Sequence, residues 1–276
     1  MTSHKTAELK AVVFDLDDTL APSKSTMDPA MSEVLAKLLE RIDVCIISGG
    51  RFEQFVAQAL DGFRADDAAM SRLHLMPTCG TRYYLWRDGQ WRLQYAEDLT
   101  DDEKSRTIAA LEAGARELEL WHPGPWGDII EDRGSQITFS ALGQQAPIAE
   151  KAAWDPDGAK KRALGAWVQQ KLPDLEVRGG GSTSLDITRK GIDKAYGIDK
   201  LVAELGVELS ELLFIGDRLD EAGNDRPVYE HGVLCVPVDG WKQTRDYVSA
   251  LIPWLDSVDL PFPLPAMMPF ASGSKA

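Results

Sequence analysis

The stretch that decides the fold is Ala11–Thr19, which reads Ala-Val-Val-Phe-Asp-Leu-Asp-Asp-Thr. Its first four residues form a short apolar run, the pattern of a strand that is buried on both faces of a parallel sheet. Downstream, Asp28-Pro29 supplies the N-cap and first residue of a helix, and Val44–Ile47 is a second apolar run. This alternation of strand and helix predicts an α/β layer with a parallel sheet.

The pattern changes in the middle of the chain. Asp88-Gly89 between two aromatic-rich stretches indicates a hairpin, and Thr100–Glu103 has the sequence of a capping box that opens a helix. A second helix is expected from Asp155-Pro156. Further strands are expected at 128–132, 136–142, 175–177 and 184–188. Together these elements predict an α+β domain with an antiparallel sheet.

After Gly191 the first pattern returns, with a helix through residues 198–205 and strands at 212–215 and 233–236. We therefore expect a discontinuous, Rossmann-like core domain made of residues 1–86 and 190–276. A second domain, residues 87–189, is inserted into it. The proline-rich tail from Pro253 is expected to be irregular.

The charge balance excludes some partners. Acidic residues outnumber basic ones 44 to 30, which gives a formal net charge of -14. Such a surface repels nucleic acid and anionic lipid, so neither is an expected partner. The three cysteines have no paired spacing, the first ten residues lack an apolar signal segment, and no apolar run is long enough to span a bilayer. We expect a cytoplasmic protein.

Unusual polar residues follow three of the predicted strands: Asp15–Thr19, Ser48–Gly50, and Gly216-Asp217 with Asn224-Asp225. Ligands of open α/β sheets bind beyond the carboxyl ends of the strands, so these groups converge if the strands are neighbours. Crowded carboxylates such as Asp15 and Asp17 repel each other unless a hard cation lies among them. The alternative for these two residues is a surface turn or a helix cap.

The other candidates have alternatives of the same kind. Ser48-Gly49-Gly50 suits an anion site, because glycines let backbone N–H groups approach it, or is a plain strand-to-helix turn. Asp217 is either a third metal carboxylate or a helix cap. Lys194 begins a helix, where a cation opposes the macrodipole. It either pairs with Asp193 or Glu221, or provides a fixed positive charge beside a carboxylate and a phosphate.

The ordered set of Asp15-Leu-Asp17-Asp18-Thr19, Ser48, Lys194 and Gly216-Asp217 with Asn224-Asp225 resembles the four motifs of the haloacid dehalogenase (HAD) superfamily. The inserted block resembles its type IIB (C2B) cap. Residues 133–143, Ser184 and Asp186 look most like the eukaryotic-type phosphomannomutase branch. The resemblance thus implies an α/β HAD core with an inserted α+β cap and, through that branch, a cap-mediated homodimer.

The resemblance also implies roles. Asp15 is the expected nucleophile that forms an aspartyl-phosphate, and Asp17 the general acid and base. Ser48, with Gly49 and Gly50, and Lys194 are expected to hold the phosphoryl oxygens. Expected Mg²⁺ ligands are Asp15, the Asp17 carbonyl and Asp217, with Asn224 or Asp225 in support. In the cap, Arg133, Ser184 and Asp186 match positions that bind a sugar phosphate.

Gln144 departs from the mutase pattern, which has an arginine there and another near Trp126. Arginine makes bidentate contacts to phosphate that glutamine cannot replace, and a mutase must hold a bisphosphate by either end. The first hypothesis is therefore a Mg²⁺-dependent phosphatase that acts on a sugar phosphate or a similar small metabolite. The alternatives are a hexose phosphomutase and a non-catalytic phosphosugar-binding protein.

Overall fold

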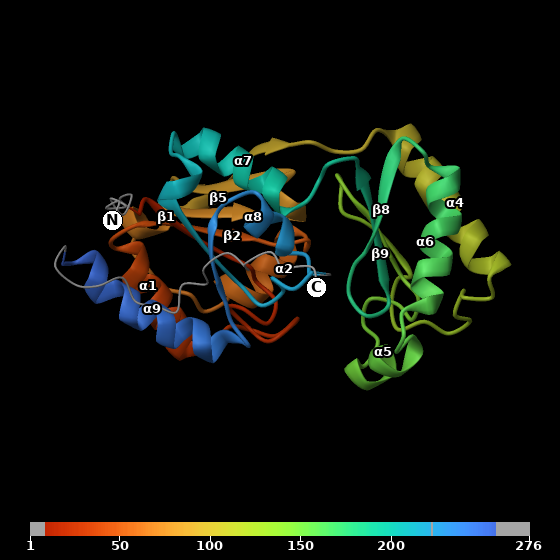
Figure 1. The fold of residues 1–276 in the computed structure, drawn as a ribbon, viewed down its shortest axis with the longest axis horizontal. Helices are drawn as coiled ribbons and strands as arrows, with labels where there is room; N and C mark the ends of the chain where they lie inside the picture. Colours follow the sequence, from red (N-terminus) through yellow and green to blue (C-terminus); the bar gives the residue numbers. More distant parts are fainter. Residues whose placement is uncertain (1–8, 222, 258–276) are drawn as a thin grey trace, which may run out of the picture. The chain divides into compact units, whose positions relative to one another are not determined.

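The computed structural model describes residues 9–221 and 223–257. The chain divides into two compact units, each with its own sheet (Figure 1). The first unit consists of the chain up to Tyr95 and from Asp193 onward, and the second unit is Ala96–Ile192. The predicted α/β fold with an additional antiparallel sheet is confirmed. Residues 87–95, which we placed in the inserted domain, lie in the first unit because their strand joins its sheet.

The sheet of the first unit has the strand order β11-β10-β1-β2-β3-β4-β5. Strands β11, β10, β1, β2 and β3 run parallel, and β4 is antiparallel to β3. The strands are β1 (Ala11–Phe14), β2 (Asp43–Ile47), β3 (Leu73–Met76), β4 (Arg82–Arg87), β5 (Gln90–Ala96), β10 (Leu212–Gly216) and β11 (Leu234–Pro237). The three strands that carry the candidate motifs, β2, β1 and β10, are therefore neighbours.

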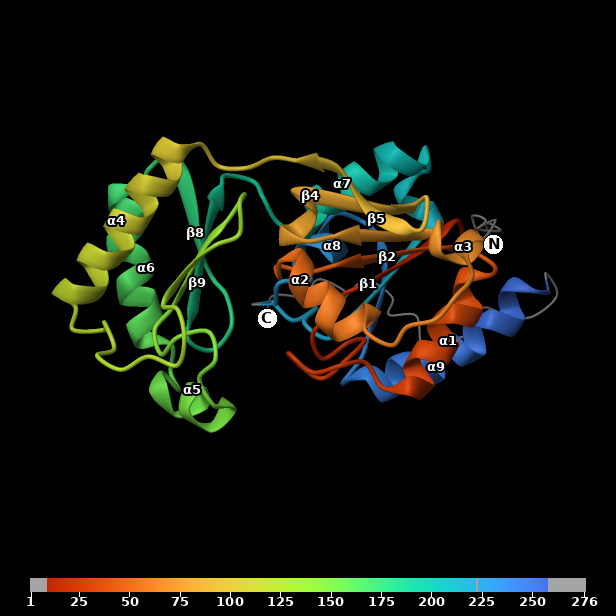
Figure 2. The same ribbon diagram turned by 180° about the vertical axis from the view of Figure 1, so that it is seen from behind.

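Helices cover both faces of this sheet (Figure 2). On one face, α1 and α9 bury Leu35 and Val248 against Phe14, and on the other, α7 and α8 bury Ile198 and Val228 with Val13. The helical elements are α1 (Pro29–Leu39), α2 (Phe52–Phe55), the π-helical turn η1 (Val56–Leu60), α3 (Asp67–Met70), η2 (Thr78–Gly80), α7 (Lys194–Leu205), η3 (Leu209–Glu211), α8 (Arg226–Glu230) and α9 (Trp241–Leu255). Coverage on both faces explains why β1 is apolar at every position.

The second unit is a four-stranded antiparallel sheet with the order β6-β7-β9-β8. Helices α4 and α6 bury Leu111 and Leu164 against Ile137 and Ile187. The elements are α4 (Asp101–Glu117), β6 (Ile130–Asp132), β7 (Ile137–Ser140), α5 (Ile148–Trp154), α6 (Ala159–Lys171), β8 (Leu175–Gly179) and β9 (Ser184–Arg189). The predicted capping box at Thr100 is confirmed, since the Thr100 and Glu103 side chains each bond the other residue's backbone.

Two predictions about where helices begin or end were wrong. Helix α6 begins at Ala159 rather than at Asp155, because the Asp155 carboxylate accepts hydrogen bonds from the Lys160 and Lys161 amides and Gly158 adopts a left-handed φ of 71°. Helix α9 continues through Pro253 to Leu255, because Ile252, Trp254 and Leu255 pack against the hydrophobic core. The rest of the predicted irregular tail, from residue 258, lies outside the described residues.

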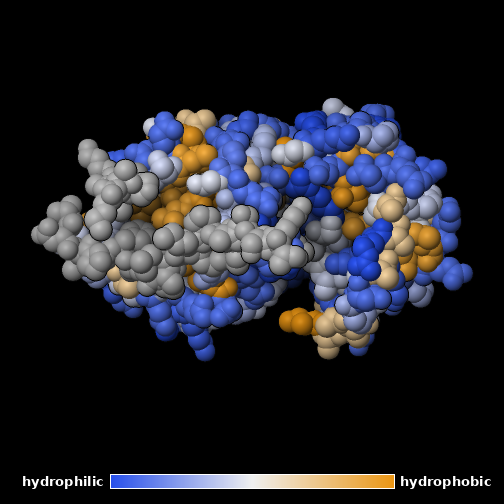
Figure 3. Space-filling view, viewed as in Figure 1, coloured by the Kyte–Doolittle hydropathy of each residue, from blue (hydrophilic) through white to orange (hydrophobic). Residues whose placement is uncertain are grey.

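The visible surface of each unit in Figure 3 is mostly hydrophilic, with scattered hydrophobic patches. This agrees with the charged composition of the chain. Among the described helices, none combines the length and the apolar character that a membrane crossing requires.

Candidate active site

Three adjacent strands deliver the first residues of the site. Asp15 follows β1, Ser48 follows β2 and Asp217 follows β10. Because these strands are parallel neighbours, their carboxyl ends lie together at one edge of the sheet. Asp15 and Ser48 are 3% and 4% exposed. The polar residues at these three strand ends therefore lie at the same edge of the sheet, as the sequence predicts.

Lys194, the first residue of α7, is the cation of the site. Its Nζ atom lies 2.5 Å from Asp15 Oδ1 and 2.5 Å from Asp225 Oδ1, and its side chain is fully buried. Burial disfavours the charged amine, but the two carboxylates outweigh this effect and raise the pKa of Lys194. The residue is thus an ammonium group shared between two acids.

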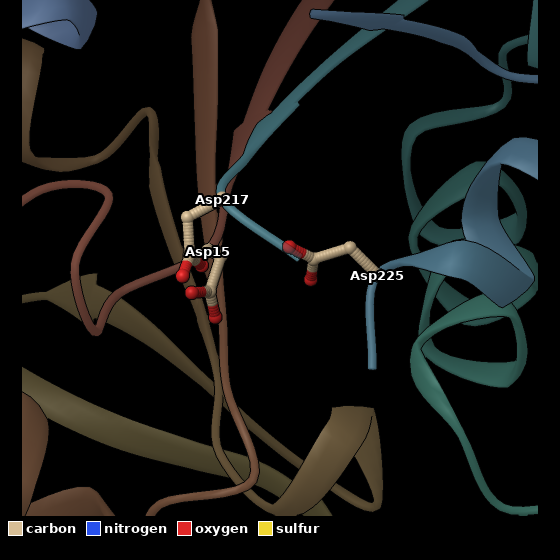
Figure 4. Close-up of side chains that lie close together, drawn as sticks. All are labelled: Asp15, Asp217 and Asp225. Carbon is tan, nitrogen blue, oxygen red and sulfur yellow. The ribbon is translucent and has the colours of Figure 1, made fainter. Parts of the chain in front are cut away.

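The acids of the site are crowded. In Figure 4 the Asp15 and Asp217 carboxylates lie side by side, and the Asp225 side chain points toward them. One oxygen from each of the three lies within 4.8 Å of the others. Burial, with the negative charges of Asp225 and Asp217, raises the pKa of Asp15 well above its usual value even though Lys194 opposes the shift. Burial and Asp225 raise the pKa of Asp217 as well.

This crowding fits a divalent cation, because a hard cation with oxygen ligands relieves the repulsion that raises both pKa values. The three acids are not equivalent, however. Asp225 already accepts hydrogen bonds from Lys194 and from the Arg218 amide. Asp217 accepts one from the Thr19 hydroxyl at 3.4 Å. Lys194 also donates to Asp15, but in Asp225 both carboxylate oxygens are engaged, so Asp15 and Asp217 would be the better placed to hold such an ion.

The Asp17 carboxylate is held by two side chains of the segment that follows Ser48 and by one backbone amide. Its Oδ1 atom accepts hydrogen bonds from the Lys24 amide at 3.0 Å and from Gln58 Nε2 at 3.2 Å, and its Oδ2 atom accepts one from Gln54 Nε2 at 2.9 Å. Gln54 also donates to Gln58 at 2.6 Å. We did not identify these two glutamines from the sequence. Their only signal is a spacing of four residues just after the Ser48 loop.

The remaining candidates of the core site, Ser48, Gly49, Asn224 and Asp225, differ in their burial and contacts. Ser48 Oγ accepts a hydrogen bond from the Gly50 amide at 3.1 Å, which closes the turn between β2 and α2. Gly49 lies between them and is partly exposed. Asp225 is buried within the site, whereas Asn224 is exposed to solvent. The described structure thus brings Asp225, rather than Asn224, to Asp15 and Lys194.

The candidates of the second unit form a separate polar cluster on the sheet face opposite α4 and α6. It consists of Glu131, Arg133, Thr138, Ser140, Ser184 and Asp186. Thr138 donates to Asp186 at 2.7 Å, the Ser140 and Ser184 hydroxyls lie 3.0 Å apart, and Arg133 pairs with Glu131 at 2.7 Å. Burial raises the pKa of Asp186, although Arg133 and two hydrogen bonds oppose the shift. Arg133, Ser184 and Asp186 are therefore gathered on one sheet face.

Gln144 and Lys151 lie in the segment between β7 and α6. Lys151, on α5, donates from Nζ to the Gln144 carbonyl at 3.0 Å. Lys151 could not be identified from the sequence, because a lysine on a short, mostly exposed helix is indistinguishable from an ordinary surface residue. It places a positive charge next to the position where the mutase pattern has arginine.

Comparisons with known proteins show which family this chain is similar to. A model of the family described as eukaryotic phosphomannomutase matches residues 31–252. A probable phosphomannomutase of Caenorhabditis elegans is 23% identical over 252 residues, which cover 89% of this chain and 96% of that protein. Phosphomannomutase 1 of Mus musculus is 24% identical and covers 79% of this chain and 82% of its own length.

Solved structures share the fold. A haloacid dehalogenase-like hydrolase from Bacteroides thetaiotaomicron has a TM-score of 0.60 at 16% identity, covering 88% of this chain and 99% of that chain. The ATP-bound IMP-nucleotidase of Plasmodium falciparum has a TM-score of 0.70 at 14% identity, covering 92% of this chain and 62% of that chain. At these identities the likeness establishes the fold alone.

Proposed function

Because the chain belongs to the eukaryotic phosphomannomutase family, within the HAD superfamily, we propose that it transfers phosphoryl groups on a sugar phosphate through an aspartyl-phosphate at Asp15. One observation carries the proposal. A fully buried ammonium group, Lys194, lies between Asp15 and Asp225 and beside Asp217. A buried charge is costly unless it is compensated, and an arrangement of this kind suits an anionic phosphoryl group.

The residues then act in sequence. An Asp15 carboxylate oxygen bonds to phosphorus while the bond from phosphorus to the sugar oxygen breaks, and Asp17 protonates that oxygen. In the second step Asp17 removes a proton from the acceptor hydroxyl, and the acceptor oxygen bonds to phosphorus while the bond from phosphorus to the Asp15 oxygen breaks. A positioned acid–base group typically contributes ~10²–10⁴-fold to the rate. Ser48 and Lys194 bind the phosphoryl oxygens, and Gln54 and Gln58 orient Asp17.

Mg²⁺ is the proposed cofactor. Asp15 and Asp217, with the main-chain carbonyl of Asp17, would hold it, and Asp225 would support the site through Lys194. When bound, such an ion supplies positive charge that offsets the negative charge on the phosphoryl oxygens. The acidic surface of the chain makes this local positive charge necessary.

The group that accepts the phosphoryl group from Asp15 decides whether the overall reaction is isomerisation or hydrolysis. The names of the relatives favour a sugar hydroxyl as this acceptor. The relatives named above are phosphomannomutases, so a hexose phosphomutase fits the comparisons better than the hydrolase that we placed first on the sequence. Hydrolysis stays the second candidate, because Gln144 stands where the mutase pattern has arginine. The substrate-binding roles of Arg133, Ser184 and Asp186, and a cap-mediated homodimer, belong to the same proposal.

A panel of hexose 1- and 6-phosphates tests the proposal, with Mg²⁺ and with or without a hexose bisphosphate. Both isomerisation and phosphate release are measured. Isomerisation that the bisphosphate stimulates establishes the mutase, and phosphate release alone establishes the hydrolase. If neither reaction occurs and beryllofluoride does not bind at Asp15, the proposed catalysis is wrong and the non-catalytic phosphosugar-binding protein is the better reading.

A further inference from the structure

The loop between β3 and β4 has an unusual backbone that the proposed mechanism does not explain. Thr78, Cys79 and Gly80 have φ values of 49°, 55° and 85°. A residue with a side chain is disfavoured in this left-handed region, so two such residues in succession indicate a conformation that the surrounding structure imposes. The contacts of this loop, η2, show what imposes it.

One side of the loop is bonded to the segment that contains Ser48. The Thr78 amide donates to the Gly50 carbonyl at 3.0 Å, and the Cys79 amide donates to the Ser48 carbonyl at 2.9 Å. The loop is closed internally by the Thr81 hydroxyl, which donates to the Thr78 carbonyl at 2.7 Å. Its conformation is therefore fixed against the proposed phosphate-binding turn.

The other side of the loop touches α7, the helix that begins with Lys194. A methyl group on Gly80 would lie 2.5 Å from the Gly197 Cα atom. A methyl group on Gly197 would lie 2.8 Å from the Cys79 carbonyl oxygen and 2.4 Å from Ile47 Cδ1. Only glycine at both positions allows the two backbones to come this close.

We propose that the contact between Gly80 and Gly197 is a positioning device that sets the depth of α7 against the Ser48 turn. It thereby places the Lys194 ammonium between Asp15 and Asp225. Gly197 lies one helical turn after Lys194, so any shift of α7 at this contact moves the ammonium group. The inference rests on the proposed function, because it assigns these glycines to the site that binds the phosphoryl group.

Gly197→Ala is the first test. The Cys79 carbonyl is backbone and cannot rotate away, so the added methyl group displaces α7. A misplacement of about 1 Å can cost ~10²-fold in rate, and we expect a loss of that order in kcat with the thermal transition retained. The matched control is Gly165→Ala in α6, whose methyl group would make only ordinary contacts, at 3.6 Å from Leu185 and 3.8 Å from Val177. It should keep the wild-type kcat.

A double-mutant cycle separates positioning from general packing. Binding of inorganic phosphate is measured by calorimetry in the wild type, Gly197→Ala, Lys194→Met and the double variant, which needs no turnover. We expect Gly197→Ala to weaken phosphate binding about 10-fold when Lys194 is present and less than about 2-fold in the Lys194→Met background, because coupled sites are non-additive. Equal losses in both backgrounds, or no loss in either, would overturn the proposal.

Folding is controlled with a second variant. If Gly197→Ala is not folded, Gly197→Ala with Ile47→Val takes its place, because valine lacks the Cδ1 atom and only the loop contact remains. The same loss of phosphate binding supports the role of the loop. Wild-type binding in this double variant would show that Ile47, rather than the loop, limits α7 and would refute the proposal. A wild-type protein that binds phosphate but turns over no substrate contradicts the proposed function and leaves this test intact.

Discussion

The core site and the polar cluster of the second unit are built in different ways. The core site joins Asp15, Lys194 and Asp225 from segments far apart in the chain, and all three side chains are buried and mutually paired. The polar cluster uses neighbouring strands, and its Arg133 pairs with Glu131 two residues away. A buried charge cluster tolerates few substitutions, whereas a sheet face with local pairs can change with the substrate. We therefore propose that the core specifies the chemistry and the second unit the substrate.

The largest expected effect comes from Asp15→Asn in the core. The amide cannot form the acyl phosphate. Removing the nucleophile from a group of catalytic residues that act as a unit costs on the order of 10⁶-fold in kcat. Isomerisation and phosphate release should both fall to background in the metabolite panel. Turnover close to wild type would show that the nucleophile is another residue. The core site would then not be the part of the molecule that carries out the chemistry.

Lys194→Met is expected to follow, with a loss of roughly 10³-fold, because it removes the charge that holds the phosphoryl oxygens. It also leaves Asp15 and Asp225 crowded without their partner. Breaking a buried ion pair typically costs about 3–5 kcal/mol, so the free energy of unfolding should fall measurably in urea. Lys151→Met in the second unit is the matched control, and it should leave the unfolding free energy nearly unchanged.

Mg²⁺ should stabilise the folded protein through the core acids alone. Saturating Mg²⁺ at about 100 times its dissociation constant adds about 2.7 kcal/mol. Since the folded pKa values of Asp15 and Asp217 are raised, protons compete with the metal. The Mg²⁺-induced rise in Tm should therefore be full above those raised values and disappear as the pH falls through them. Asp217→Asn should abolish the rise at neutral pH, and an undiminished rise would place the metal elsewhere.

Gln144→Arg should have the smallest effect and act only on substrate choice. A bidentate arginine contact to a second phosphate is a charge-assisted interaction of ~1.5–3 kcal/mol, so affinity for a hexose bisphosphate should rise about 10-fold. The ratio of isomerisation to phosphate release should rise with it, while phosphate release from monophosphates stays within about 2-fold. A changed rate of release with an unchanged ratio would contradict the division of roles.

Much of the core could be predicted because its signals are local. The apolar runs of β1, β2 and β10 fixed the strands, and polar residues at their ends marked the edge of the sheet. Lys194 was recognisable because a lysine at a helix N-terminus opposes the dipole and needs a compensating partner. The structure supplies two such partners.

What could not be predicted depends on tertiary contacts. Strand β3 was not predicted, because His74 interrupts its apolar run. In the folded protein the His74 Nδ1 atom lies 2.6 Å from the Tyr83 hydroxyl, a partner that the sequence does not reveal. Gln54 on α2 and Gln58 on the π-helical turn η1 both donate to Asp17, and this π-helical turn has no sequence signal. The choice of Asp225 over Asn224 is a matter of loop geometry, since both residues are suitable in type.

The most direct test of the central claim is acid-quench labelling with a ³²P-labelled sugar phosphate that the protein turns over. The account predicts a transient, alkali-labile label on the peptide that contains Asp15, and no label in Asp15→Asn protein. Turnover by wild-type protein without any such label, or with the label on another residue, would contradict it.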